Sequence, residues 1–139
     1  MKYTIIAKYS LYIIALGHVV IGISIPLLVA TGGFDAYVHS LNSAIAVPSQ
    51  DAVNVQKALI ALFGPTIASW GILFFLVLKL GIENSSRALF ALLLASILCW
   101  AIYDSMLSLY FEFYPNLYIN FLASILIFIP LLVLKRRIH

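Results

Sequence analysis

The segment ALFALLLASILCWAIYDSMLSL, residues 88–109, decides the class of fold. It is as long as a helix that crosses the hydrocarbon core of a membrane, which takes about 20 apolar residues. Lipid offers no hydrogen-bond partners to backbone N–H and C=O groups, so a segment of this kind must be helical. Its one charged residue is Asp104. The segment therefore predicts a transmembrane helix that contains a carboxylate.

Three further apolar runs, residues 9–30, 58–78 and 117–134, have similar length. Of the 139 residues, 64% are hydrophobic and only 9% are charged. Soluble domains are roughly a quarter charged, and this chain could not cover a water-exposed surface with polar groups. The strict alternation of a barrel strand is absent. The sequence predicts an all-α polytopic membrane protein, a four-helix bundle in a single domain over residues 1–139.

The first run, residues 9–30, also has the basic front of a signal peptide. It is longer than the apolar region of a signal, which has about 7–15 residues. The only Ala-x-Ala cleavage pattern, residues 44–46, lies well beyond its end. We therefore expect residues 9–30 to be a permanent span.

Basic residues indicate the orientation. Seven of the eight Lys and Arg residues flank the spans on one side, and only Lys57 lies on the other. Cytoplasmic loops carry an excess of Lys and Arg, so both termini are expected in the cytoplasm, in a bacterial inner membrane. The net charge of +3 is explained by these flanks, so we expect membrane lipids as partners and no nucleic acid.

The connection over residues 31–57 is then external. Within it, Phe34, Tyr37, Val38, Leu41 and Ile45 share one face at helical spacing, which fits either a short interfacial helix or a plain loop. Ser49 is a suitable cap for a helix that starts before the second span.

Two further features concern the spans themselves. Pro65 in the second span predicts a bend that opens space beside Trp70 or Asn120. The aromatic loop over residues 110–116 is expected at the outer headgroup level.

Asp104 is the most costly residue in the spans. It lies six residues before Tyr110, or about 9 Å below the outer interface. An unpaired carboxylate in a span costs about 3 kcal/mol, so Asp104 is expected to face the protein interior. Asn120 descends to a similar depth from the other end of the same loop, which makes it the expected hydrogen-bond partner. Lys57 is the one basic residue on that side, and we expect it to reach Asp104 from the outer mouth of the bundle.

Other polar or aromatic residues within the spans complete a candidate cluster. It could form a pocket, open toward the outer face, that binds a ligand, or it could consist of interhelical hydrogen bonds that fix the packing. The members of this candidate binding cluster are Asp104, His18, Asn120, Trp100, Trp70, Thr66 and Lys57.

Small residues form lines on two of the spans. Ala61, Gly64, Ala68 and Gly71 share one face of the second span, and residues 91, 95 and 99 form another line on the third. Small residues let helices approach closely, either within one chain or in a homo-oligomer.

Sequence signatures of catalysis are scarce. One cysteine, Cys99, allows no intramolecular disulfide, and no His, Cys and carboxylate residues have metal-ligand spacing. Phosphate-binding glycine loops and nucleophile motifs are absent. We therefore expect neither catalytic residues, nor a cofactor, nor a metal, and no enzymatic activity.

The function expected from the sequence is that of a small membrane protein that binds a partner protein, a lipid or an apolar ligand. Its loops are too short to host another activity, which suits an accessory subunit, an assembly factor or an immunity-type protein. The alternative is a small oligomeric transporter with Asp104 as the coupling carboxylate. Four helices are few for a transport path in one monomer, so this alternative requires at least a dimer.

Overall fold

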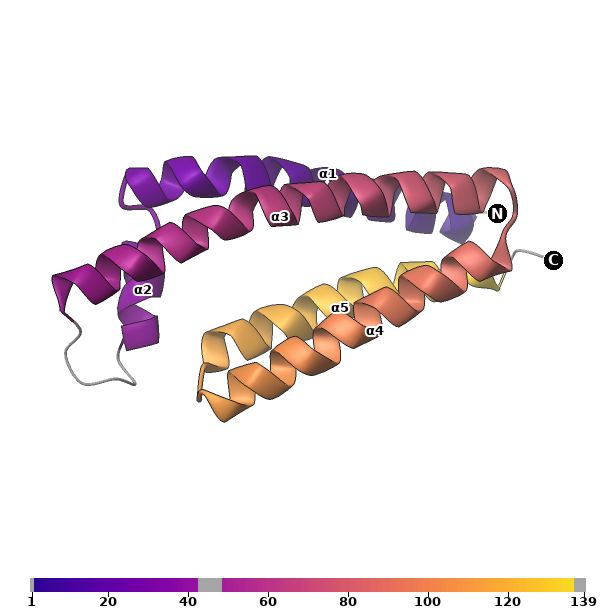
Figure 1. The fold of residues 1–139 in the computed structure, drawn as a ribbon. Helices are drawn as coiled ribbons and strands as arrows, with labels where there is room; N and C mark the ends of the chain where they lie inside the picture. The colour runs from indigo at the N-terminus through magenta and orange to yellow at the C-terminus, as the bar shows by residue number, and fades with distance from the viewer. Residues whose placement is uncertain (1, 43–48, 137–139) are drawn as a thin grey trace. The chain divides into compact units, whose positions relative to one another are not determined.

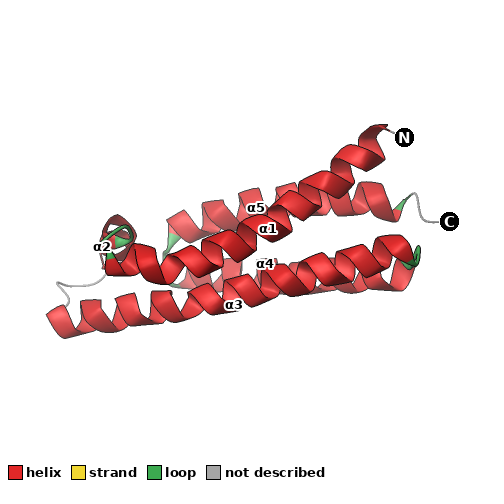
Figure 2. Cartoon of the chain, turned by 90° about the horizontal axis from the view of Figure 1, so that it is seen from above, coloured by secondary structure: helices red, strands yellow, loops and turns green. Residues whose placement is uncertain are grey.

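The computed structural model describes residues 2–42 and 49–136, and in these ranges it contains five helices and no strand (Figure 1). Short loops join most of them (Figure 2). The all-α prediction is confirmed for this part of the chain. The helices are α1 Lys2–Ala30, α2 Asp35–Asn42, α3 Gln50–Glu83, α4 Arg87–Tyr110 and α5 Tyr114–Lys135.

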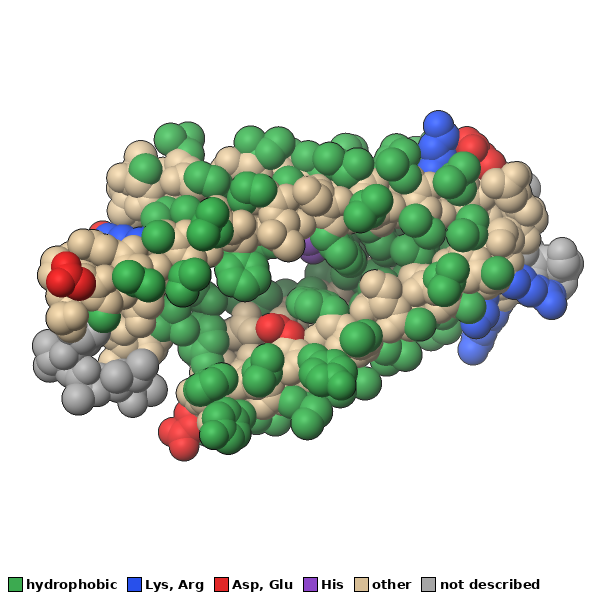
Figure 3. Space-filling model, in the orientation of Figure 1, with side chains coloured by type: hydrophobic (Ala, Val, Ile, Leu, Met, Phe, Trp, Pro, Cys, Tyr) green, Lys and Arg blue, Asp and Glu red, His purple; other side chains and the backbone are tan. Residues whose placement is uncertain are grey.

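Four of these helices, α1, α3, α4 and α5, are long and apolar enough to cross a membrane. Each contains one of the four predicted spans, which makes this an integral membrane protein. Figure 3 shows hydrophobic side chains over most of the visible face, with the Lys and Arg side chains near helix ends. Such a surface suits contact with lipid rather than with water.

The contacts divide the chain into two units, Met1–Leu16 with Leu73–His139, and Gly17–Ile72. Both boundaries fall inside helices, because α1 and α3 each continue from one unit into the other. We call the first the hairpin unit, since it contains all of α4 and α5, and the second the crossing unit.

The hairpin unit is built on α4 and α5, which lie side by side in Figures 1 and 2. The hydroxyl of Ser86 caps α4 by accepting a hydrogen bond from Leu89 N at 3.3 Å. At the other end of α4, Phe113 N donates to Ser108 O at 2.7 Å, so the chain reverses within a few residues. Apolar side chains fill the core of the unit, and the fully buried ones in α4 and α5 are Phe90, Ile97, Ile127 and Leu131.

The crossing unit is built on a close approach of α1 to α3. A methyl group on Gly22 would lie 2.4 Å from Ala68 N and 2.5 Å from Gly64 O, so the two backbones are in direct contact. Pro26 has no N–H, which leaves the Gly22 carbonyl without its usual helical donor. A Cβ added to Gly64 would lie 2.5 Å from that carbonyl oxygen, so the carbonyl lies close against the backbone of α3 at a glycine. Gly64 and Ala68, from the predicted small-residue line on α3, therefore pack against α1 of the same chain.

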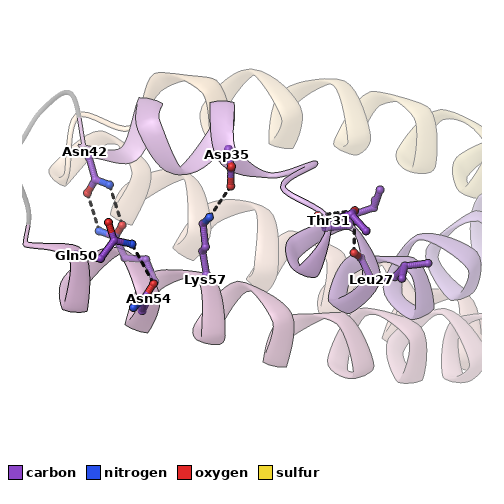
Figure 4. Close-up of polar contacts among 9 residues, drawn as sticks. Leu27, Thr31, Asp35, Asn42, Gln50, Asn54 and Lys57 are labelled. Carbon is purple, nitrogen blue, oxygen red and sulfur yellow. Dashed lines mark hydrogen bonds and ion pairs between the residues drawn. The ribbon is translucent and has the colours of Figure 1, made fainter.

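The segment after α1 forms the short helix α2, so a helix is confirmed over Asp35–Asn42 and the plain loop is wrong there. Its place at the membrane interface stays a prediction. Val38 is buried, while Ile45, the last residue of the pattern, lies outside the described residues. Two polar contacts fasten α2 to α3 (Figure 4). Asp35 Oδ1 pairs with Lys57 Nζ at 2.6 Å, and the Asn42 and Gln56 amides exchange hydrogen bonds of 3.0 and 2.8 Å.

Helix α3 begins before the apolar run, as predicted. Ser49 Oγ accepts a hydrogen bond from Ala52 N at 3.3 Å, which confirms Ser49 as its cap. The helix continues without interruption through Pro65. The bend at this proline, and the space it would open, stay predictions.

Candidate functional site

Asp104 is the centre of a polar cluster in the hairpin unit. Its Oδ2 atom accepts hydrogen bonds from the side-chain amides of Asn116 at 2.7 Å and Asn120 at 2.5 Å. Both asparagines belong to α5, so the carboxylate on α4 is held from the neighbouring helix. The predicted contact between Asp104 and Asn120 is confirmed.

Ser108 extends this cluster by one turn of α4. Its hydroxyl donates to the Asp104 carbonyl oxygen at 2.7 Å and accepts from the Asn116 amide at 2.8 Å. Asn116 thus uses its amide group on both Asp104 and Ser108. Linked hydrogen bonds of this kind polarise and orient one another, so the cluster holds the carboxylate in one orientation.

The two oxygens of Asp104 have different surroundings. Asn120 and Ser108 are only 2% and 5% exposed, whereas Asp104 is partly exposed. In the described part of the hairpin unit no donor contacts Oδ1, although every buried side-chain polar atom there has a partner. Oδ1 therefore reaches the surface of this unit. The two asparagine amides thus bind one carboxylate oxygen of Asp104, Oδ2, and leave the other, Oδ1, accessible.

The spacing of residues explains how the sequence builds this cluster. Asp104 and Ser108 are four apart on α4, and Asn116 and Asn120 are four apart on α5, so each pair lies along one helix face. The tight turn between the helices then brings the two faces to the same level. Asn116 and Ser108 are site residues that the predicted cluster omits, although the four-residue spacing puts Ser108 on the same side of its helix as Asp104 and Asn116 on the same face as Asn120.

Aromatic side chains surround the turn between α4 and α5. Tyr110, Phe111 and Tyr114 are all exposed, and Tyr110 and Phe111 contact each other edge to face with their ring centres 4.9 Å apart. Exposed aromatic side chains at the end of a span are typical of the headgroup level. Asp104 lies six residues, or about one and a half helical turns, before the end of α4 at Tyr110.

Trp100 lies one turn before Asp104 on α4. The spacing of four puts both residues on the same side of the helix. The indole is 40% exposed, so it lies at the surface of the structure rather than in the core between α4 and α5.

The other four residues of the predicted cluster belong to the crossing unit. The rings of His18 and Trp70 pack together with their centres 4.7 Å apart and a tilt of 55°. Lys57 pairs with Asp35. Thr66 is exposed and lines a shallow depression of about 200 Å³ along α3, together with Leu59, Leu62 and Phe63. A single pocket that gathers the whole predicted cluster, and the approach of Lys57 to Asp104, stay predictions.

Metal-ligating residues do not gather in the described part of the chain, where no group of three or more His, Cys, Asp or Glu side chains could hold an ion. Cys99 is exposed and unpaired on α4. The candidate site is therefore the oriented carboxylate with its two amides and its hydroxyl.

No protein-family model matches the chain, and no curated protein or solved structure does either.

Proposed function

We propose that this is a small non-enzymatic membrane protein that binds a partner protein, a lipid or an apolar ligand at the outer half of α4 and α5. The observation that carries the proposal is the carboxylate of Asp104, which is oriented through Oδ2 and open at Oδ1. A side chain needed only for packing would have both oxygens enclosed, since an open carboxylate oxygen in a span is costly. A group of another molecule that binds Oδ1 would explain why this oxygen is open.

The proposed setting is a bacterial inner membrane with both termini in the cytoplasm. It rests on the seven basic residues that flank the spans on one side. In that orientation α2 and the aromatic turn between α4 and α5 are external, and the open oxygen of Asp104 belongs to the outer half of the membrane. The partner is then reached from within the membrane or from the outer face.

Cysteine labelling is expected to place α2 outside and the turn after α3 inside. In a Cys99→Ala background, the exposed positions His39 and Asn84 each provide a site for one introduced cysteine. A membrane-impermeant maleimide should label His39→Cys in intact bacterial cells, and Asn84→Cys only after the cells are permeabilised. Labelling of His39→Cys only after permeabilisation would show the opposite orientation.

Binding at this face is expected to depend on the charge of Asp104. A photo-crosslinking amino acid at the exposed position 103 should give one discrete product in native membranes, identified as protein, lipid or small molecule by mass spectrometry. Asp104→Asn keeps an acceptor of similar shape but removes the charge, so we expect the yield to fall several-fold while the fold is retained. A crosslinker at the exposed position 129, near the other end of α5, is the matched control. An unchanged yield at position 103 in Asp104→Asn contradicts the proposal.

The transporter alternative uses the same open oxygen differently, to bind and release a proton or cation. It requires an oligomer, since four helices are few for a transport path. A purified wild-type protein that is monomeric and moves no protons or cations in vesicles counts against this alternative. Flux that is lost in Asp104→Asn would favour it over the binding protein.

A further inference from the structure

We propose that the open oxygen of Asp104 receives a Lys or Arg side chain from a transmembrane helix of a different membrane protein. This inference rests on the proposed function and gives the chemistry of the partner. The surface concerned, which we call the α4 stripe, consists of Trp100, Tyr103 and Leu107 beside Asp104.

The first step is the charge of the cluster. The groups that hold Asp104 Oδ2 are two amides, which orient the carboxylate without neutralising it. Ser108 is also neutral, and in the described part of the hairpin unit no cationic side chain pairs with Asp104. A charge at this depth is costly, and ionisable residues in spans commonly pair with one another. The missing component of the site is therefore a cation.

The second step is the depth of the site. Oδ1 belongs to a residue about 9 Å along the helix from the aromatic turn. The ammonium group of a phospholipid lies at the headgroup level, above this depth. Lys and Arg have long apolar stems that carry their charge several ångström from the backbone, so a residue within a neighbouring span can place its charge here. Depth thus favours a protein side chain over a lipid headgroup.

The third step is the source of the cation. Residues 9–30, 58–78, 88–109 and 117–134 of this chain contain no Lys or Arg. Lys57, the one basic residue on the outer side, pairs with Asp35 of its own unit. A second copy of the chain therefore offers no Lys or Arg from within these four apolar runs. Charge complementarity points to a different protein with a basic residue in the outer half of a span.

The fourth step is the surface beside the open oxygen. Trp100, Tyr103 and Leu107 follow each other at spacings of three and four, so they form one line along α4. Their exposed fractions are 40%, 68% and 54%. An apolar line of this kind lets a partner helix lie along α4 while its basic side chain reaches Asp104. The exposed indole of Trp100 adds an aromatic face that attracts a cation.

The test uses the full-length protein in phosphatidylcholine bilayers and synthetic transmembrane peptides of Leu and Ala. One peptide has a single Lys at the depth of Asp104, the second has Leu at that position, and the third has its Lys in the opposite leaflet. Energy transfer between dye-labelled peptide and protein measures binding. We expect the depth-matched Lys peptide to bind about tenfold more tightly than the Leu peptide, equivalent to about 1.4 kcal/mol. The peptide with Lys in the opposite leaflet should show no such preference.

Two protein variants test whether the preference for the depth-matched Lys peptide depends on Asp104. Asp104→Asn should abolish it, whereas Glu112→Gln, which removes the exposed carboxylate in the turn of the same hairpin, should leave it unchanged. A peptide with Glu in place of the depth-matched Lys should bind wild-type protein more weakly than the Leu peptide, which tests the charge without any variant. Equal binding of the Lys and Leu peptides, or a preference that survives in Asp104→Asn, overturns the inference.

A lipid amine is the competing occupant, and the same assay identifies it. If phosphatidylethanolamine in the bilayer removes the preference for Lys, and does so only when Asp104 is present, the lipid ammonium binds the site and the inference is wrong. A negative result with the Lys peptides is distinct from a failure of the proposed function. The crosslinked product at position 103 can still depend on Asp104 when no Lys peptide is preferred, which would leave a non-basic partner.

Discussion

A single methyl group added to Gly22 is expected to lower the free energy of unfolding by about 3 kcal/mol, the upper part of the usual cost of overpacking. The new Cβ in Gly22→Ala would lie 2.4 Å from Ala68 N, 2.5 Å from Gly64 O and 2.9 Å from Ala68 Cα. All three atoms belong to the backbone of α3, so no side chain can rotate away. The two helices must separate, and they then lose the packing around the crossing.

Gly64→Ala should have a similar effect, because its Cβ would lie 2.5 Å from Gly22 O and 2.9 Å from Pro26 Cδ. The double variant should cost less than the sum of the two single variants, since one separation of the helices relieves both clashes. Reversible unfolding in detergent micelles, followed by circular dichroism, gives these free energies.

Gly17 provides the matched control on the same helix. A methyl group there has no neighbouring atom within 4 Å, so Gly17→Ala adds no clash. Alanine is favoured over glycine inside a helix by about 1 kcal/mol, and this variant should be as stable as the wild type or more stable. Equal free energies of unfolding for Gly22→Ala and Gly17→Ala would contradict the close contact between the α1 and α3 backbones at Gly22.

Replacing Asp104 with leucine is expected to lower the free energy of unfolding by about 2 kcal/mol, because a buried donor then loses its acceptor. Asn120 is 2% exposed, and its amide donates to Asp104 Oδ2. Asp104→Asn retains a carbonyl acceptor at this position, so its loss of stability should stay below about 1 kcal/mol. The contrast between the two variants separates the hydrogen bonds from the charge.

The double variant Asp104→Leu/Asn120→Leu should regain most of the lost stability. Replacing both partners of a buried hydrogen bond by apolar groups leaves no unsatisfied donor and is often nearly neutral. Glu112→Gln in the exposed turn serves as the control and should leave the stability unchanged. An Asp104→Leu variant more stable than the wild type would mean that the carboxylate faces the acyl chains.

The sequence by itself determined the features that depend on distance along one helix. Residues 88–109 had to form a helix of membrane length, because lipid offers the backbone no other partner. The periodicity of residues 34–45 was compatible with a helix for a similar reason but left a plain loop open, and the structure decided for α2 over Asp35–Asn42. The match between Asp104 and Asn120 also follows from counting, because two helices joined by a tight turn reach equal depth after equal numbers of residues.

Only the tertiary structure decided the features that depend on how helices are rotated and placed against one another. In the sequence Gly17 and Gly22 are alike, yet only Gly22 has the α3 backbone opposite it. Counting residues paired Asp104 with Asn120 but did not show that both amides bind Oδ2 and leave Oδ1 open. Lys57 has a basic side chain of long reach, and its pairing with Asp35 depends on where α2 packs against α3. The physical reason is that hydropathy and depth are properties of single segments, whereas a contact requires the rotation and register of two.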